Sequence, residues 1–127
     1  TAAAMAAAAV TWLYGGSSEQ VATAVALSLQ GMLGLICDPI GGLVEIPCIY
    51  RNASAAMQAV SSAEMALAGL DFPVSADEVI DVMGEVGRRM PAAYRETAMG
   101  GLATTPSARR LVQLGGRPTG KPSGASR

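Results

Sequence analysis

The sequence predicts an all-α fold, a compact helical domain of about five to six helices interrupted by one loop rich in glycine and proline. Half of the 127 residues are hydrophobic but only 4% are aromatic, and alanine, the strongest helix former, supplies much of the apolar content. Two capping-box patterns precede apolar runs, and no segment alternates with the period of two that a half-buried strand shows. The length suits one domain, which we place at residues 1–114.

The first two helices are predicted from alanine content and a serine cap. Residues 2–14 form the first helix, which a pair of glycines ends. Ser17 starts the second helix, because Gln20 follows three residues later and completes a capping box. This helix runs to about Leu33 and is apolar on nearly every face, so we expect it at the centre of the bundle.

The uncharged stretch over residues 20–37 is close to membrane-spanning length. Thr23, Ser28 and Gln30 interrupt it, and no basic flank orients it. We therefore expect a buried helix of a soluble bundle and no membrane association.

Further helices are expected after the central loop. A third helix over residues 48–68 is ended by Gly69. Ser75 and Glu78 form the second capping box and open a helix that runs to about residue 90. One stripe of this helix is apolar and is expected to face the core, and it consists of Val79, Met83, Val86 and Met90.

The last part of the domain is predicted to hold two short helices and a tail. Pro91 suits the first turn of a helix over residues 91–99, and residues 105–114 form the last helix. Residues 115–127 contain glycine, proline, serine and basic residues without apolar content, which predicts a disordered tail.

Two absences exclude several kinds of chemistry. The chain contains no histidine, so it offers no histidine base and no histidine metal ligand. Its one lysine, Lys121, lies in the predicted tail, which argues against a Schiff base with pyridoxal phosphate. The net charge of −1 gives no reason to expect nucleic acid as a partner.

The chain begins at Thr1 inside an apolar run, so we expect it to be a piece of something longer, and the run is not a signal peptide. Two cysteines are too few for a disulfide scaffold. In a chain without export signals, which we expect in the cytoplasm, they are either functional thiols or inert core residues.

The central loop reads CDPIGGLVEIPC and places the two cysteines at its ends, Cys37 and Cys48. Its prolines and glycines forbid a continuous helix. Cys48 is expected at a helix N-terminus, where the local dipole stabilises a thiolate. A pair of cysteines with this spacing is not a zinc signature, and from spacing alone a loop without a function stays open as the alternative.

Three segments carry a resemblance to one family. LGLICDPIGGLVEIPCIYRNA, SSEQVATAVALSLQGMLGL and EVIDVMGEVGRRMPAAYRETAMGGLATTPSARRL resemble the α domain of the iron–sulfur-dependent L-serine dehydratases, also called L-serine ammonia-lyases. The resemblance covers the chain to about residue 111, and its central motif is long and specific.

The resemblance implies a [4Fe–4S] cluster held by three cysteines, without pyridoxal phosphate. Cys37 and Cys48 match two of the ligands, and the third is expected upstream of Thr1. The implied reaction is dehydration and deamination of L-serine to pyruvate and ammonia, a step of amino-acid catabolism that feeds gluconeogenesis. The open iron would act as a Lewis acid on the substrate hydroxyl.

The resemblance also suggests roles for residues near the thiols. Asp38, Arg51 and Asn52 are candidates for contacts with the substrate or with the cluster ligands, although Arg51 and Asn52 can equally serve the start of a helix. Arg95 and Glu96 form either an ion pair that closes the site or a solvated pair. No residue of the chain is assigned as the base that removes the α-proton, which is expected in the missing upstream part.

Further partners are implied by the same resemblance, namely an upstream α segment and a β domain or subunit, with a homo-oligomer as a further option. Alone, the chain is expected to be inactive. Two other functions stay open: a non-catalytic helical interaction or regulatory module, and a cluster-dependent lyase for a related hydroxy-amino acid.

Overall fold

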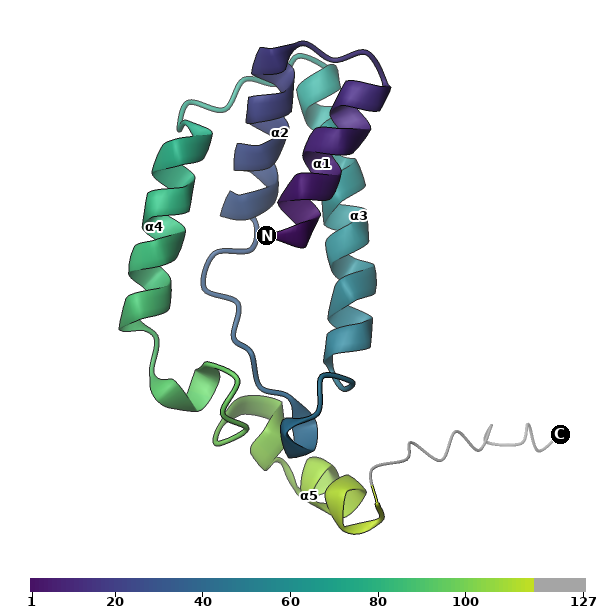
Figure 1. The fold of residues 1–127 in the computed structure, drawn as a ribbon, viewed down its shortest axis with the longest axis vertical. Coiled ribbons are helices and arrows are strands. Elements are labelled where there is room, and N and C mark those ends of the chain that lie inside the picture. Colours follow the sequence, from purple (N-terminus) through teal and green to yellow (C-terminus); the bar gives the residue numbers. More distant parts are fainter. Residues whose placement is uncertain (116–127) are drawn as a thin grey trace, which may run out of the picture.

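Five α-helices and three short 3-10 helices form the regular structure of residues 1–115, the part of the chain that this computed structural model describes (Figure 1). These residues contain no β-strand, so the predicted all-α class is confirmed. The predicted disordered tail lies outside the described residues, apart from Gly115, which lies in a turn after the last helix.

Four helices stand side by side at one end of the molecule (Figure 1). They are α1 (Ala2–Leu13), α2 (Ser18–Gln30), α3 (Cys48–Leu67) and α4 (Ala76–Arg89). The opposite end holds the short elements η1 (Ile40–Gly42), η2 (Ala92–Tyr94), η3 (Gly101–Thr104) and α5 (Pro106–Gln113). The chain between α2 and η1 joins the two ends.

The core is built mainly from alanine, as the composition predicted. Helix α2 packs against α1, α3 and α4, which confirms its central place. Ala7, Ala24 and Ala63 are fully buried, and small side chains at these contacts let the helix axes approach closely. The apolar stripe of α4 faces inward as predicted, with Val79 buried and Met83 packed against the same core cluster.

Both predicted capping boxes are present. Ser17 accepts a hydrogen bond from the Gln20 amide, Ser75 accepts one from the Glu78 amide, and each partner side chain accepts from the cap residue's backbone. Thr105 caps α5 through its side chain alone, which accepts a hydrogen bond from the Ala108 amide, and Pro106 lies in the first turn. Helix α2 ends at Gln30, earlier than predicted, because a turn begins at the next residue.

The predicted short helix over residues 91–99 is wrong. Only the 3-10 turn of η2 forms there, and Glu96 and Ala98 adopt positive φ angles of 65° and 55°. The backbone on either side of Arg95 instead pairs with Cys37. Tertiary pairing has therefore overridden the helix propensity of this segment.

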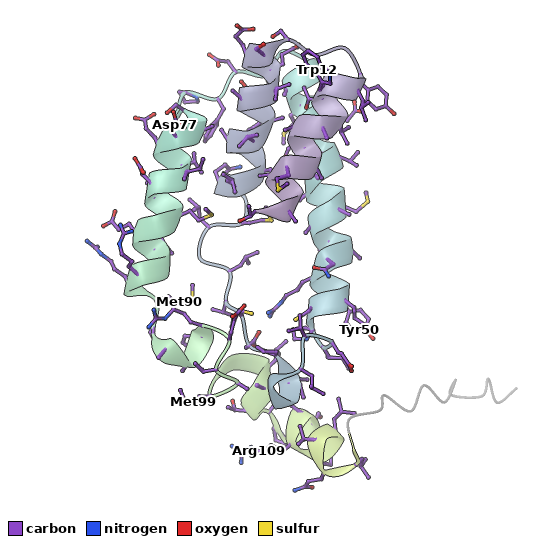
Figure 2. All side chains as sticks on the ribbon, in the orientation of Figure 1. Trp12, Tyr50, Asp77, Met90, Met99 and Arg109 are labelled. Carbon is purple, nitrogen blue, oxygen red and sulfur yellow. The ribbon has the colours of Figure 1, made fainter. Side chains whose placement is uncertain are left out.

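Helix α1 exposes large apolar side chains on its outer side and at its end. Met5, Trp12 and Leu13 are 68%, 66% and 80% exposed, and Trp12 is visible near the end of the helix in Figure 2. A second exposed apolar group, Leu43 and Val44, follows η1. Within residues 1–115, no helix combines the length and the apolar character that crossing a membrane requires.

The Ser75 cap offers a test of this helical framework. Ser75→Ala is expected to lower the free energy of unfolding by about 1 kcal/mol at pH 7, because the Glu78 amide loses its acceptor. Hydrogen bonds from the side chain and backbone of Ser75 lower the pKa of Glu78. The stabilisation from this carboxylate is present above its ordinary pKa and is lost as the pH falls through the lowered value, so the difference between variant and parent should shrink in acid.

Urea unfolding of the parent and of Ser75→Ala, from pH 7 down to below the lowered pKa of Glu78, measures this difference in the free energy of unfolding. Ser61→Ala is the matched control, because Ser61 is exposed inside α3 and caps no helix. An equal loss in both variants would contradict the assigned cap.

Candidate functional site

The two cysteines lie at the two ends of the loop that joins α2 to α3. Cys37 lies in the extended stretch before η1, and Cys48 is the first residue of α3, directly after the cis peptide bond between Ile46 and Pro47. Both are free, partly exposed thiols. The expectation that Cys48 opens a helix is confirmed.

A segment from the far end of the chain holds the backbone of Cys37. The Cys37 amide donates to the Tyr94 carbonyl at 2.9 Å, and the Glu96 amide donates to the Cys37 carbonyl at 2.8 Å. These two bonds form an isolated parallel bridge between Cys37 and Arg95. The position of the first thiol therefore depends on residues about sixty positions further along the chain.

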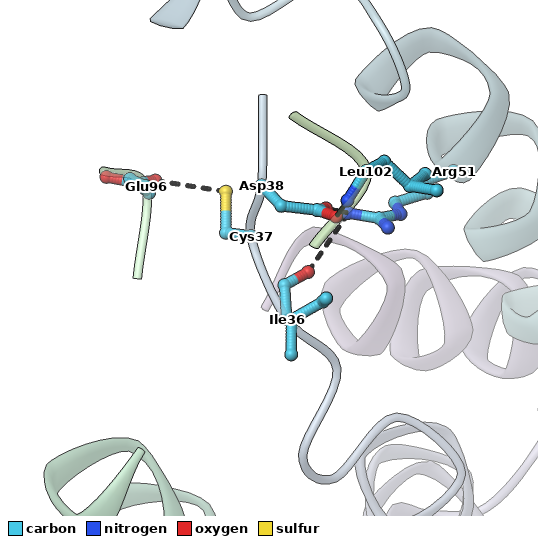
Figure 3. A network of polar contacts seen from close by, with 6 residues as sticks. All are labelled: Ile36, Cys37, Asp38, Arg51, Glu96 and Leu102. Atoms are coloured by element: carbon cyan, nitrogen blue, oxygen red, sulfur yellow. Dashed lines mark hydrogen bonds and ion pairs between the residues drawn. The ribbon is translucent and has the colours of Figure 1, made fainter. Parts of the chain in front are cut away.

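The side chain of Cys37 points toward Glu96 (Figure 3). Its thiol donates to Glu96 Oε1 at 3.7 Å. Burial, the charge of Glu96 and the neighbouring thiol of Cys48 raise the pKa of Cys37, while the Arg51 guanidinium lowers it. A metal that binds Cys37 must displace its proton.

Asp38 points to the opposite side of the chain and is completely buried (Figure 3). Arg51 Nη1 donates to Asp38 Oδ1 at 2.6 Å and to the Ile36 carbonyl at 3.0 Å. The Leu102 amide donates to Asp38 Oδ2 at 2.5 Å. One carboxylate thus joins the thiol loop, α3 and η3, and we call these contacts the Asp38 clamp.

Gly101 completes the clamp. It has a φ of 61°, a conformation that side chains disfavour, and a Cβ atom built on it would collide with the Asp38 carboxylate. Close approach to a buried charge therefore requires glycine here.

The structure brings most of the predicted site residues together. Asp38 and Arg51 lie beside the thiols, with both oxygens of Asp38 already hydrogen-bonded, which favours an orienting role over direct contact with a substrate. Asn52 is exposed on α3, and its side chain makes no hydrogen bond to residues 1–115, so its role stays a prediction. Of the two alternatives for Arg95 and Glu96, the ion pair is not formed, and both residues are exposed.

Two contacts escaped the sequence reasoning, namely the Leu102 amide on Asp38 and the Glu96 carboxylate on Cys37. Each joins residues about sixty positions apart, and neither has a local sequence pattern. The glycine pair before Leu102 is visible in the sequence, but it does not indicate which residue the backbone approaches there.

The donor set of this loop suits part of an iron–sulfur ligand set. Thiolates are the ligands that such clusters use, and this loop carries one free thiol at each of its two ends. Residues 1–115 contain no group of three Cys, Asp or Glu side chains that could hold a metal ion together. These residues fit two ligand positions and leave any others to be filled from elsewhere.

Two cavities flank the stretch from Gly31 to Cys37. One, of about 370 Å³, lies toward α4 and is lined by Cys37, Arg95 and Glu96 as well as apolar side chains. The other, of about 280 Å³, lies toward α3 and includes Arg51.

Fold and site together define the class of this protein, an all-α domain in which one clamped loop presents two thiols. The family model for the serine dehydratase alpha chain matches residues 1–103. The chain therefore belongs to the serine dehydratase alpha chain family, as its resemblance predicted.

Curated relatives agree with this assignment. The chain is 53% identical over 111 residues to a probable L-serine dehydratase, alpha chain, of Bacillus subtilis, a match that covers 87% of this chain and 37% of the relative. It is 48% identical to the L-serine dehydratase, alpha chain, of Peptoniphilus asaccharolyticus, covering 87% and 38%. Identity to L-serine dehydratase 1 of Escherichia coli is 51%, covering 78% and 22%. The chain thus spans well under half the length of these relatives.

Replacing Glu96 tests the electrostatics around the first thiol. Glu96→Gln removes a negative charge and weakens the acceptor of the Cys37 proton, so the pKa of Cys37 should fall. Because the thiolate is the nucleophile, iodoacetamide at pH 7 should alkylate Cys37 faster in the variant. Mass spectrometry of the two cysteine peptides separates this rate from that of Cys48.

Glu64→Gln, an exposed position on α3, is the matched control and should leave the Cys37 rate unchanged. An unchanged rate in both variants would show that Glu96 does not act on the thiol.

Proposed function

We propose that this chain is the part of an L-serine dehydratase that supplies two cysteine ligands, Cys37 and Cys48, to a [4Fe–4S] cluster. The observation that supports it best is one loop that carries a free thiol at each end, with its Cys37 end held by hydrogen bonds from residues 94–102. Membership of the serine dehydratase alpha chain family supports the reaction class. The reaction converts L-serine to pyruvate and ammonia.

When bound, the cluster would supply a Lewis-acidic iron without a protein ligand, which favours departure of the substrate hydroxyl. The residues of this chain have other tasks. Cys37 and Cys48 must lose their protons to act as ligands, and the nearby Arg51 guanidinium favours the thiolate of Cys37. The Asp38 clamp keeps both ends of the loop in place, since Asp38 follows Cys37 directly and Arg51 lies one helical turn after Cys48.

Other parts of the enzyme are proposed to complete this site. The chain has only two cysteines, so a third ligand must come from another segment, which we place in the upstream α part together with the base that removes the α-proton. The exposed apolar side chains of α1 suit contact with that part or with a β domain or subunit. A cytoplasmic location, a role in gluconeogenesis and the independence from pyridoxal phosphate remain predictions of the same proposal.

Anaerobic reconstitution with iron and sulfide tests the proposal. The chain is prepared alone and joined to the upstream segment of its gene, and visible absorption of the cluster and pyruvate release from L-serine are recorded. We expect a stable cluster and pyruvate only in the joined form. Cys37→Ser and Cys48→Ser should each abolish the absorption, whereas Ser54→Cys, an exposed position on α3, should not increase it.

Other results would point to the remaining functions. A joined form without a cluster would overturn the proposal and favour a helical interaction module. A cluster without pyruvate release would favour a lyase for a related hydroxy-amino acid.

A further inference from the structure

We infer that Arg95 and Glu96 recognise the two charged groups of a free α-amino acid, Arg95 its carboxylate and Glu96 its ammonium. The inference rests on the proposed function and adds the binding residues to it. Its starting point is the cavity of about 370 Å³ between α4 and the stretch that leads to Cys37.

This cavity lies on the thiol side of the loop. Figure 3 shows the Cys37 side chain directed toward Glu96 and away from Asp38. Cys37 and Glu96 both line the cavity, and their side chains are 3.7 Å apart. A ligand in the cavity would therefore lie next to the first proposed cluster ligand.

The cavity carries one positive and one negative side chain. Arg95 and Glu96 are the only Asp, Glu, Lys or Arg residues among the described residues that line it. They are adjacent in sequence, yet both line the cavity. In a fully extended chain, neighbouring side chains point to opposite sides, but the positive φ of Glu96, 65°, departs from that conformation. The cavity is also lined by apolar side chains, among them Met83 and Val86 of α4 and Met90 directly after it.

Neither charge is neutralised within the described part of the chain. No ion pair joins Arg95 to Glu96, and the Arg95 side chain makes no hydrogen bond to residues 1–115. The Glu96 carboxylate accepts only the weak hydrogen bond from the Cys37 thiol. Both groups are thus available to a ligand.

A free amino acid has the complementary charges. Its carboxylate and ammonium are attached to the same carbon, which matches an arginine and a glutamate on neighbouring residues. The guanidinium of Arg95 donates to the carboxylate oxygens, and Glu96 accepts from the ammonium. A side-chain hydroxyl is then free to face Cys37.

The second cavity is the less suitable of the two. Its guanidinium, that of Arg51, already donates to Asp38 and to the Ile36 carbonyl. Among residues 1–115, no acidic side chain lines this cavity, so these residues offer no partner for an ammonium group.

Titration of the cluster-free chain followed by amide NMR spectra tests the inference without any activity measurement. The ligands are L-serine, 3-hydroxypropionate, which lacks the ammonium, and ethanolamine, which lacks the carboxylate. L-serine should shift the amides of Gly87, Arg95 and Glu96 and should bind about tenfold more tightly than either analogue.

Variants assign each charge to its residue. In Glu96→Gln, L-serine and 3-hydroxypropionate should bind equally, and in Arg95→Gln, L-serine and ethanolamine should bind equally. Arg89→Gln is the matched control, because Arg89 is exposed on α4 and does not line the cavity, and it should keep the preference of the parent.

Three results would overturn the inference: no response to L-serine, equal responses to all three ligands in the parent, or shifts confined to the amides around Arg51. None of them affects cluster formation by Cys37 and Cys48, so the proposed function is judged separately by reconstitution.

Discussion

Gly101→Ala is expected to lower the free energy of unfolding by about 3 kcal/mol, the sum of an unfavourable backbone conformation and a collision with a buried charge. The φ of 61° at Gly101 disfavours any residue with a Cβ atom, and that atom would meet the Asp38 carboxylate. Relief of the collision requires Asp38 to move, which breaks its hydrogen bonds from Leu102 and Arg51. Urea unfolding followed by circular dichroism measures the change.

Gly69→Ala separates the two contributions. Gly69 has a φ of 83°, but no atom lies within 4 Å of a Cβ built there. This control should lose only about 1 kcal/mol, the cost of the backbone conformation. If Gly101→Ala lost no more than Gly69→Ala, the close packing of Gly101 on Asp38 would be refuted.

Arg51→Met is expected to cost a similar amount, about 3 kcal/mol, because it leaves a buried carboxylate without its counterion. Asp38 has no exposed side-chain surface, whereas the Arg51 side chain is 39% exposed, which places the cost at the lower end for such pairs. The Leu102 amide remains as the last donor to Asp38. The midpoint of urea unfolding again provides the measurement.

A double variant shows whether the unpaired charge is the cause. Asp38→Asn in the Arg51→Met background should recover at least ~1 kcal/mol, because a neutral amide is less costly to bury than a lone carboxylate. Arg109→Met, at an exposed position on α5, is the control and should be nearly neutral. A double variant less stable than Arg51→Met would argue against a counterion role for Arg51.

The helical framework was predictable because its signals are local. The caps at Ser17 and Ser75 depend on contacts three residues apart, and the alanine-rich helices depend on propensity and a small-residue core. The loop between the cysteines was also recognised, since its prolines and glycines exclude a helix. Family resemblance came from the same loop, where the sequence is most distinctive.

The site was predictable only in part. Asp38 and Arg51 were selected because they are close to the cysteines in sequence, but nothing local indicated that they bind each other or that Leu102 joins them. The segment around Arg95 and Glu96 was predicted as a helix, because its residues favour one. In the structure it is not helical, and Arg95 instead forms a β-bridge with Cys37. That error concealed the cavity that both charges line.

By itself, the sequence determined the class of fold, the places where the main helices begin, the identity of the two thiols and the family. Tertiary structure decided how the thiol loop is held, which charges face Cys37 and why Gly101 cannot carry a side chain. The physical reason is the sequence separation of the interacting residues. Caps and helix propensities depend on residues within about one helical turn of each other. The hydrogen bonds of the Asp38 clamp and of the Cys37 bridge join residues whose proximity exists only after the whole chain has packed.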